Sequence, residues 1–93
     1  MIRIAILLLL LGGFVAAQND RSLVRQGNDL FDQGDFEGAL YNYQEAYVLN
    51  PDPSILYNIA NTKYRLEQFQ EAEKDLEQLL SMRLSKELFS DVC

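Results

Sequence analysis

From residue 20 onward, apolar residues recur every three or four positions, which is the spacing of one face of an α-helix. We expect four helices, over residues 20–33, 36–49, 53–67 and 69–82. Gly34-Asp35 separates the first two, because glycine adopts the left-handed conformation that ends a helix and aspartate caps the next one. Asn50-Pro51 separates the middle two, because proline cannot continue a helix. The sequence shows no strand pattern, so the fold class is all-α, with short connections that make neighbouring helices antiparallel.

The chain nearly repeats itself at an offset of 33 residues. The pairs that show the repeat are Leu23 and Leu56, Gly27 and Ala60, Asn28 and Asn61, Phe31 and Tyr64, Phe36 and Phe69, and Ala39 and Ala72. A period in this range is typical of a solenoid, in which each unit buries its apolar face against its neighbour. Glu67-Gln68 stands where the first unit has Gly34-Asp35, and we expect a less sharp helix boundary there. Stacked helical units usually present a surface to a partner rather than a catalytic site.

Residues 1–17 have the composition of a secretory signal peptide. Arg3 supplies a basic start, an apolar run follows from Ile4 to Val15, and Ala16-Ala17 offers the small residues that precede a cleavage site. We expect cleavage before Gln18, which leaves residues 18–93 as one small domain. The apolar run is shorter than the ~20 residues that a membrane span needs. An uncleaved membrane anchor over residues 4–17 is the alternative.

The charge and the missing residue types exclude several classes of function. The chain has 8 Lys and Arg against 14 Asp and Glu, and this acidic balance argues against binding nucleic acid or an anionic membrane surface. The sequence contains no histidine, which is the commonest general base and metal ligand. Cys93 is the only cysteine, so no internal disulfide can form. We therefore expect no enzymatic activity, no catalytic residue, no metal and no cofactor.

The repeat resembles the tetratricopeptide repeat (TPR), a pair of antiparallel helices with a Trp-x2-Leu-Gly-x2-Tyr, Ala-x3-Phe and Pro signature. In the first unit the positions of that signature are Leu23, Gln26, Gly27, Leu30, Ala39, Tyr43 and Pro51. In the second unit they are Leu56, Ile59, Ala60, Lys63, Ala72 and Leu76, with Lys63 in an aromatic's place and Leu84 in place of the proline. The resemblance implies a short right-handed solenoid. Repeat one then covers residues 20–52, repeat two covers 53–82, and a short tail or partial capping helix covers 83–93.

In TPR proteins the first helix of each pair lines a concave groove, and the resemblance implies a partner-binding surface there. The residues that we expect to bind a partner are Asn28, Phe31, Tyr57, Asn58, Asn61, Tyr64 and Arg65, with Val24 and Asp32 on the same face. An asparagine amide donates and accepts hydrogen bonds, a tyrosine adds apolar area with a polar tip, and Arg65 can pair with an acidic group. The alternative is that these asparagines and tyrosines only support the fold. Some TPR proteins grip a terminal carboxylate with basic groove residues; Val24 replaces one of these, so we do not transfer that clamp.

The sequence favours a protein–protein interaction or adaptor module of an exported protein, secreted or in a bacterial periplasm, with a peptide or partner protein in the groove. One alternative is a membrane-tethered structural or assembly subunit that keeps its N-terminal anchor. Another is the N-terminal fragment of a longer TPR protein, because two repeats are fewer than the three or so that a solenoid normally needs. The last helix then exposes an apolar edge at Leu76, Leu79, Leu80, Leu84 and Leu88. A folded-back tail, self-association or a continuing repeat would cover this edge.

Overall fold

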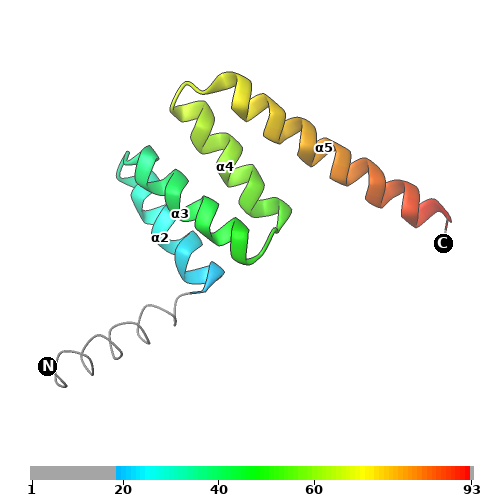
Figure 1. Ribbon diagram of the computed structural model, residues 1–93, viewed down its shortest axis with the longest axis horizontal. Coiled ribbons are helices and arrows are strands. Elements are labelled where there is room, and N and C mark those ends of the chain that lie inside the picture. The colour runs from blue at the N-terminus through cyan, green and yellow to red at the C-terminus, as the bar shows by residue number, and fades with distance from the viewer. Residues whose placement is uncertain (1–18, 93) are drawn as a thin grey trace, which may run out of the picture.

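The computed structural model describes the backbone of residues 19–92 and the side chains of residues 19–87. The predicted signal peptide over residues 1–17, its cleavage site, and the side chains of Leu88 and Cys93 lie outside this part. Four helices occupy it, α2 (Asp20–Asp32), α3 (Phe36–Leu49), α4 (Pro53–Arg65) and α5 (Phe69–Val92). Each helix packs antiparallel against the next (Figure 1). The described residues contain no strand, and the predicted all-α stack of two helix hairpins is confirmed.

The helices begin where the sequence supplies capping residues. Asn19 and Ser22 form a capping box at α2: the Asn19 side chain accepts from the Ser22 N–H at 2.9 Å, and the Ser22 hydroxyl accepts from the Asn19 N–H at 3.2 Å. Asp52 caps α4 by accepting from the N–H and the hydroxyl of Ser54, and these bonds lower the pKa of the Asp52 carboxyl. The caps satisfy backbone donors that have no partner inside a helix.

The two hairpin turns have the same backbone geometry although their sequences differ. In the first turn Gly34 has a φ of +83°, and the next residue donates its N–H to the carbonyl five residues back at 2.8 Å. In the second turn Glu67 has a φ of +63°, and the next residue donates in the same way at 2.8 Å. The expected less sharp boundary at Glu67-Gln68 is wrong, because matching hydrogen bonds close both helices. A glutamate in this left-handed region is less stable than a glycine by about 1 kcal/mol.

The second turn can be improved by giving it the sequence of the first. Asp35 caps α3 by accepting from the Gly38 N–H at 3.0 Å, and Gln68 holds the corresponding place before α5. We expect Glu67→Gly combined with Gln68→Asp to raise the free energy of unfolding by roughly 1–2 kcal/mol, because it removes backbone strain and adds a cap. Thermal unfolding followed by circular dichroism measures the change. Lys74→Gly on the exposed side of α5 is the control, with an expected loss of about 1 kcal/mol; a double variant that also loses stability contradicts the prediction.

Small residues let the helices approach closely, as the repeat pattern predicts. The buried apolar residues are Leu23, Ala39, Tyr43, Ala46, Ile55, Leu56, Ile59, Ala60 and Ala72. Gly27 lies against the Tyr43 ring, and a Cβ built on Gly27 would be 2.7 Å from Cε1 of that ring. The apolar pattern missed Thr62, which is fully buried and donates its hydroxyl to the Asn58 carbonyl at 2.6 Å. This bond satisfies the hydroxyl, so a threonine can occupy a core position.

Lys63 stands where the repeat signature has an aromatic residue, and it joins the helices of the second hairpin by charge. Its Nζ lies 2.7 Å from Oδ2 of Asp75 on α5, and both side chains are mostly buried. Removing one partner of such a pair leaves the other charge buried without its counterion. The neighbouring Tyr64 is 61% exposed, so it does not fill the missing aromatic's place in the core.

The last helix is longer than the sequence pattern indicated. We expected it to end near Met82, with a short tail or partial capping helix after it; instead α5 continues without a break to Val92. No proline or glycine stands between these two residues. Arg83 Nε lies 3.3 Å from Glu87 Oε1, an i,i+4 pair that supports a helix. In Figure 1 the end of α5 runs past α4 and away from the rest of the stack, so it does not fold back as a cap.

Candidate partner-binding face

The first helices of the two pairs, α2 and α4, bring most of the predicted partner-binding residues onto one side of the stack. The members on α4 recur at i, i+4, i+7 and i+8, so they share one side of that helix. The guanidinium carbon of Arg65 lies 5.8 Å from the centre of the Phe31 ring, so the two helices meet at this side. We define the α2–α4 face by Asn28, Phe31, Tyr57, Asn61, Tyr64 and Arg65.

The residues of α4 are the most accessible part of the α2–α4 face. Tyr57 and Tyr64 are 58% and 61% exposed, and Asn61 and Arg65 are exposed beside them. Asn58, the remaining predicted residue, is half-buried and lies at the edge of the face. Two exposed tyrosines with an amide and a guanidinium beside them offer both apolar area and hydrogen bonds to a peptide or protein.

Asn28 and Asn61 hold equivalent positions but have different surroundings. The Tyr43 hydroxyl donates to Asn28 Oδ1 at 2.5 Å, so the acceptor of this amide is engaged inside the first hairpin. Burial raises the pKa of Tyr43, and the Asp32 carboxylate raises it further, so the hydroxyl stays protonated and remains the donor. In the second repeat Leu76, which has no hydroxyl, stands in the place of Tyr43. Asn28 therefore offers mainly its amide N–H groups to a ligand, whereas no tyrosine of this kind engages Asn61.

An aromatic pair stabilises each hairpin next to its turn. The Phe31 and Phe36 ring centres are 5.0 Å apart with an interplanar angle of 70°, and those of Tyr64 and Phe69 are 5.1 Å apart with an angle of 69°. These edge-to-face contacts are favourable and repeat at the 33-residue offset. Phe31 is half-buried and also packs against the core, whereas Tyr64 keeps most of its surface open. Of the two aromatic positions, Tyr64 is thus the one that remains accessible to a partner.

A hollow of about 480 Å³ opens between α2 and the start of α4. Its lining residues are Asp20, Arg21, Val24, Arg25, Asn28, Asn50, Asp52, Ser54 and Ile55. Asn50 Nδ2 donates to Asp20 Oδ2 at 3.0 Å, which ties the α3–α4 loop to the start of α2. Sequence reasoning missed Arg21 and Arg25, although their i,i+4 spacing places them on adjacent turns of one helix. The two arginines give this end of the α2–α4 face charged hydrogen-bond donors.

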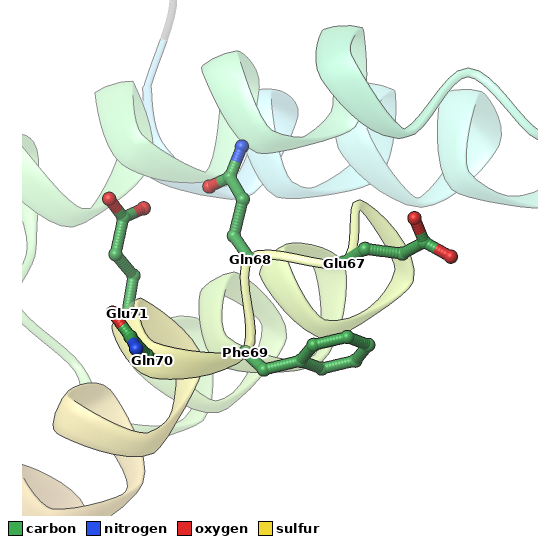
Figure 2. A pocket seen from close by; sticks show the side chains of 5 residues that line it. All are labelled: Glu67, Gln68, Phe69, Gln70 and Glu71. Atoms are coloured by element: carbon green, nitrogen blue, oxygen red, sulfur yellow. The ribbon is translucent and has the colours of Figure 1, made fainter.

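A second hollow, of about 310 Å³, lies at the α4–α5 turn. It is lined by the consecutive residues Glu67, Gln68, Phe69, Gln70 and Glu71. In Figure 2 the side chains of Glu67 and Phe69 point away from those of Gln68 and Glu71, so the four do not converge on one point. A site holds its ligand from several sides, and this hollow is formed by one short stretch of chain. We assign it no function.

The described residues show neither a metal site nor a membrane-spanning helix. Among the side chains of residues 19–87 there is no group of three cysteine, aspartate or glutamate residues placed to hold a metal ion. None of the four described helices combines the length and the apolar character that crossing a membrane requires.

Two family models match the chain. One, described as TPR repeat, matches residues 27–67, and the other, described as Tetratricopeptide repeat, matches residues 54–85. Together with the antiparallel helix pairs, these matches identify residues 27–85 as TPR-type helical repeats. No curated protein and no solved structure gives a match. The class that the repeats define is a module for interaction between proteins, and such repeats are typically not catalytic.

Proposed function

We propose that this chain is the protein-binding module of an exported protein, and that it holds a peptide or a partner protein on the α2–α4 face. The observation that carries the proposal is the pair Tyr57 and Tyr64, which are 58% and 61% exposed on one side of α4. Tyrosines with so much surface in water contribute little to burial, and tyrosine is enriched in protein interfaces. Asn61 and Arg65 lie beside them and supply hydrogen bonds and charge. Arg21 and Arg25 extend the polar part of this surface along α2.

A triple variant on α4 tests the binding role. Tyr57→Ala, Asn61→Ala and Arg65→Ala together should weaken partner binding at least tenfold, because they remove exposed contacts at the centre of the face. Asn28 and Tyr64 are left unchanged because both support the fold. Asn28 accepts a hydrogen bond from Tyr43, and Tyr64 packs on Phe69. Affinity capture from an extract of the native host identifies the partner, and titration calorimetry with that partner measures the loss.

The matched control changes exposed residues on the other side of the stack. Tyr41→Ala with Val48→Ala removes two exposed side chains of α3, outside the α2–α4 face. This control should bind like the wild type, and circular dichroism should show equal helicity in all three proteins. Equal capture of the partner by the wild type and by the triple variant would show that the α2–α4 face is not the binding surface.

Export rests on the sequence of residues 1–17, with its basic start, apolar run and small residues before Gln18. We expect mass spectrometry of the protein from its native host to show an N-terminus at Gln18. An intact Met1 in a membrane fraction would contradict cleavage and favour the alternative, a tethered structural or assembly subunit. This measurement is independent of the binding experiment.

A further inference from the structure

α5 carries an exposed apolar row on a side that no helix within residues 19–92 covers. We define the α5 row by Leu76, Leu80 and Leu84, which are between 48% and 59% exposed. At the 33-residue offset, Leu76 and Leu80 correspond to Tyr43 and Tyr47 of α3. Those two tyrosines pack in the core cluster that includes two isoleucines of α4. The exposed side of α5 therefore corresponds to the side of α3 on which α4 packs.

The other end of the stack is polar, so copies of this chain do not match head to tail. The residues of α4 that are buried on the side of the preceding repeat include Ile55, Ile59 and Thr62. The corresponding residues of α2 are Ser22, Gln26 and Asp29. Placing α2 of a second copy on the α5 row would bury these polar groups against leucines, which is unfavourable without hydrogen-bond partners. The longest exposed aliphatic row that a second copy offers, among the described residues, is its own α5 row.

We propose that the α5 row is covered by α5 of a second copy, in an antiparallel pair related by a two-fold axis. Two helices that pack along their length contact each other through residues spaced alternately four and three positions apart. Six exposed residues of α5 have this spacing: Phe69, Glu73, Leu76, Leu80, Arg83 and Glu87. When the two-fold axis crosses the helix pair at the level of Gln78, Leu76 of each copy lies opposite Leu80 of the other. Glu73 of each copy then lies opposite Arg83 of the other. Such a contact is self-complementary and closes on itself, so it forms a dimer and not a filament.

Charge selects this arrangement over its alternatives. An antiparallel pair with its axis at Leu80 would place Glu73 opposite Glu87, and a parallel pair would place each Glu73 opposite the other. Both bring like charges together, which weakens association. With the axis at Gln78, opposite charges flank the central leucines on both sides. Arg83 Nε already lies 3.3 Å from Glu87 Oε1 in its own helix, so Glu73 of the second copy joins an existing ion pair.

The end of α5 provides a second argument for a cover. α4 has 13 residues and α5 has 24, so the last part of α5 extends past its neighbour (Figure 1). A helical segment of ~10 residues without tertiary contacts is only marginally stable in water. Arg83, Leu84 and Glu87 belong to this segment and are exposed. An antiparallel second copy packs against this segment and stabilises it.

Sedimentation equilibrium of the purified chain tests the dimer. We expect a concentration-dependent species of twice the monomer mass. Leu80→Glu should shift it to monomer over the whole concentration range. Val48→Glu places the same side chain at a residue of α3 that is 80% exposed, and it should leave the dimer intact. A wild-type chain that stays monomeric up to ~1 mM, a concentration that would reveal even weak association, overturns the proposal, as does a Leu80→Glu variant that dimerises like the wild type.

Exchanging the charges of Glu73 and Arg83 tests which residues of the two α5 helices lie opposite each other, without changing the apolar contacts. Glu73→Arg alone and Arg83→Glu alone should each weaken the dimer about tenfold, because each places two like-charge pairs in the contact. The double variant should restore the wild-type affinity, and an equimolar mixture of the two single variants should form mixed dimers. Equal dimerisation of the wild type and both single variants overturns the pairing. The triple variant on α4 should dimerise normally, so a failed dimer and a failed binding face are distinguishable.

Discussion

Replacing Tyr43 with alanine is expected to unfold the domain or leave it barely stable. The Tyr43 side chain is 3% exposed, packs on Gly27, and belongs to the core cluster that joins α2, α3 and α4. Removing a buried aromatic ring costs roughly 3–5 kcal/mol, from lost apolar contact and from the cavity left behind. This loss is a large part of the total stability of a small domain, which is about 5–15 kcal/mol. Urea and thermal unfolding followed by circular dichroism measure it.

Two control variants distinguish the contribution of the Tyr43 ring to stability from that of a tyrosine elsewhere on the same helix and from that of the hydroxyl. Tyr41 lies on the same helix and is 63% exposed, so Tyr41→Ala should change the free energy of unfolding by less than about 0.5 kcal/mol. Tyr43→Phe keeps the ring and removes only the hydroxyl that donates to Asn28, with an expected loss of about 1 kcal/mol. If Tyr43→Ala and Tyr41→Ala melt at the same temperature, Tyr43 does not hold the helices together.

The helices could be predicted because their signals are local. α3 has the predicted bounds Phe36–Leu49, since Asp35 caps its start and Asn50-Pro51 stops it. The second turn was harder, because Glu67 lacks the local signal of a glycine and adopts the same conformation under the constraint of the packed hairpin. The end of α5 was missed although its signals are local too. Apolar residues still recur every four positions after Met82, at Leu84, Leu88 and Val92, and no residue that breaks a helix follows.

The candidate face could be predicted as a set of positions, but its contacts could not. Periodicity indicates which side of a helix a residue faces, and so it groups the exposed residues of α4 correctly. It does not indicate which side chain from another helix lies opposite. The bond from Tyr43 to Asn28 joins α3 to α2, and the ion pair of Lys63 with Asp75 joins α4 to α5. Both depend on the depth and rotation of helix packing, which side-chain volumes determine together.

The two repeats hold different residues at the positions where Gly27 meets Tyr43, and Leu76 of the second repeat is 48% exposed, whereas Tyr43 is buried. The first repeat has Gly27 and Tyr43, and the second has Ala60 and Leu76 at the corresponding positions. In the second repeat a methyl group corresponds to the glycine and a smaller side chain to the ring. In the first repeat a residue without a side chain on one helix faces a large ring on the other.

Gly27 and Tyr43 are thus expected to act as a unit, so that Gly27→Ala with Tyr43→Leu is less harmful than the two single changes predict. Gly27→Ala places a Cβ 2.7 Å from the Tyr43 ring and should cost about 1–2 kcal/mol, even after a gain in helix propensity. Tyr43→Leu leaves space over Gly27 and should cost about 2 kcal/mol. In the double variant the new methyl group occupies part of that space, so the summed loss should fall by about 1 kcal/mol or more in a double-mutant cycle. Gly27→Ala with Tyr41→Leu is the matched control, and its two effects should add, because Tyr41 is exposed. Additive losses in both cycles would mean that the ring moves aside for the methyl group, and that the close approach of α2 and α3 does not depend on the glycine.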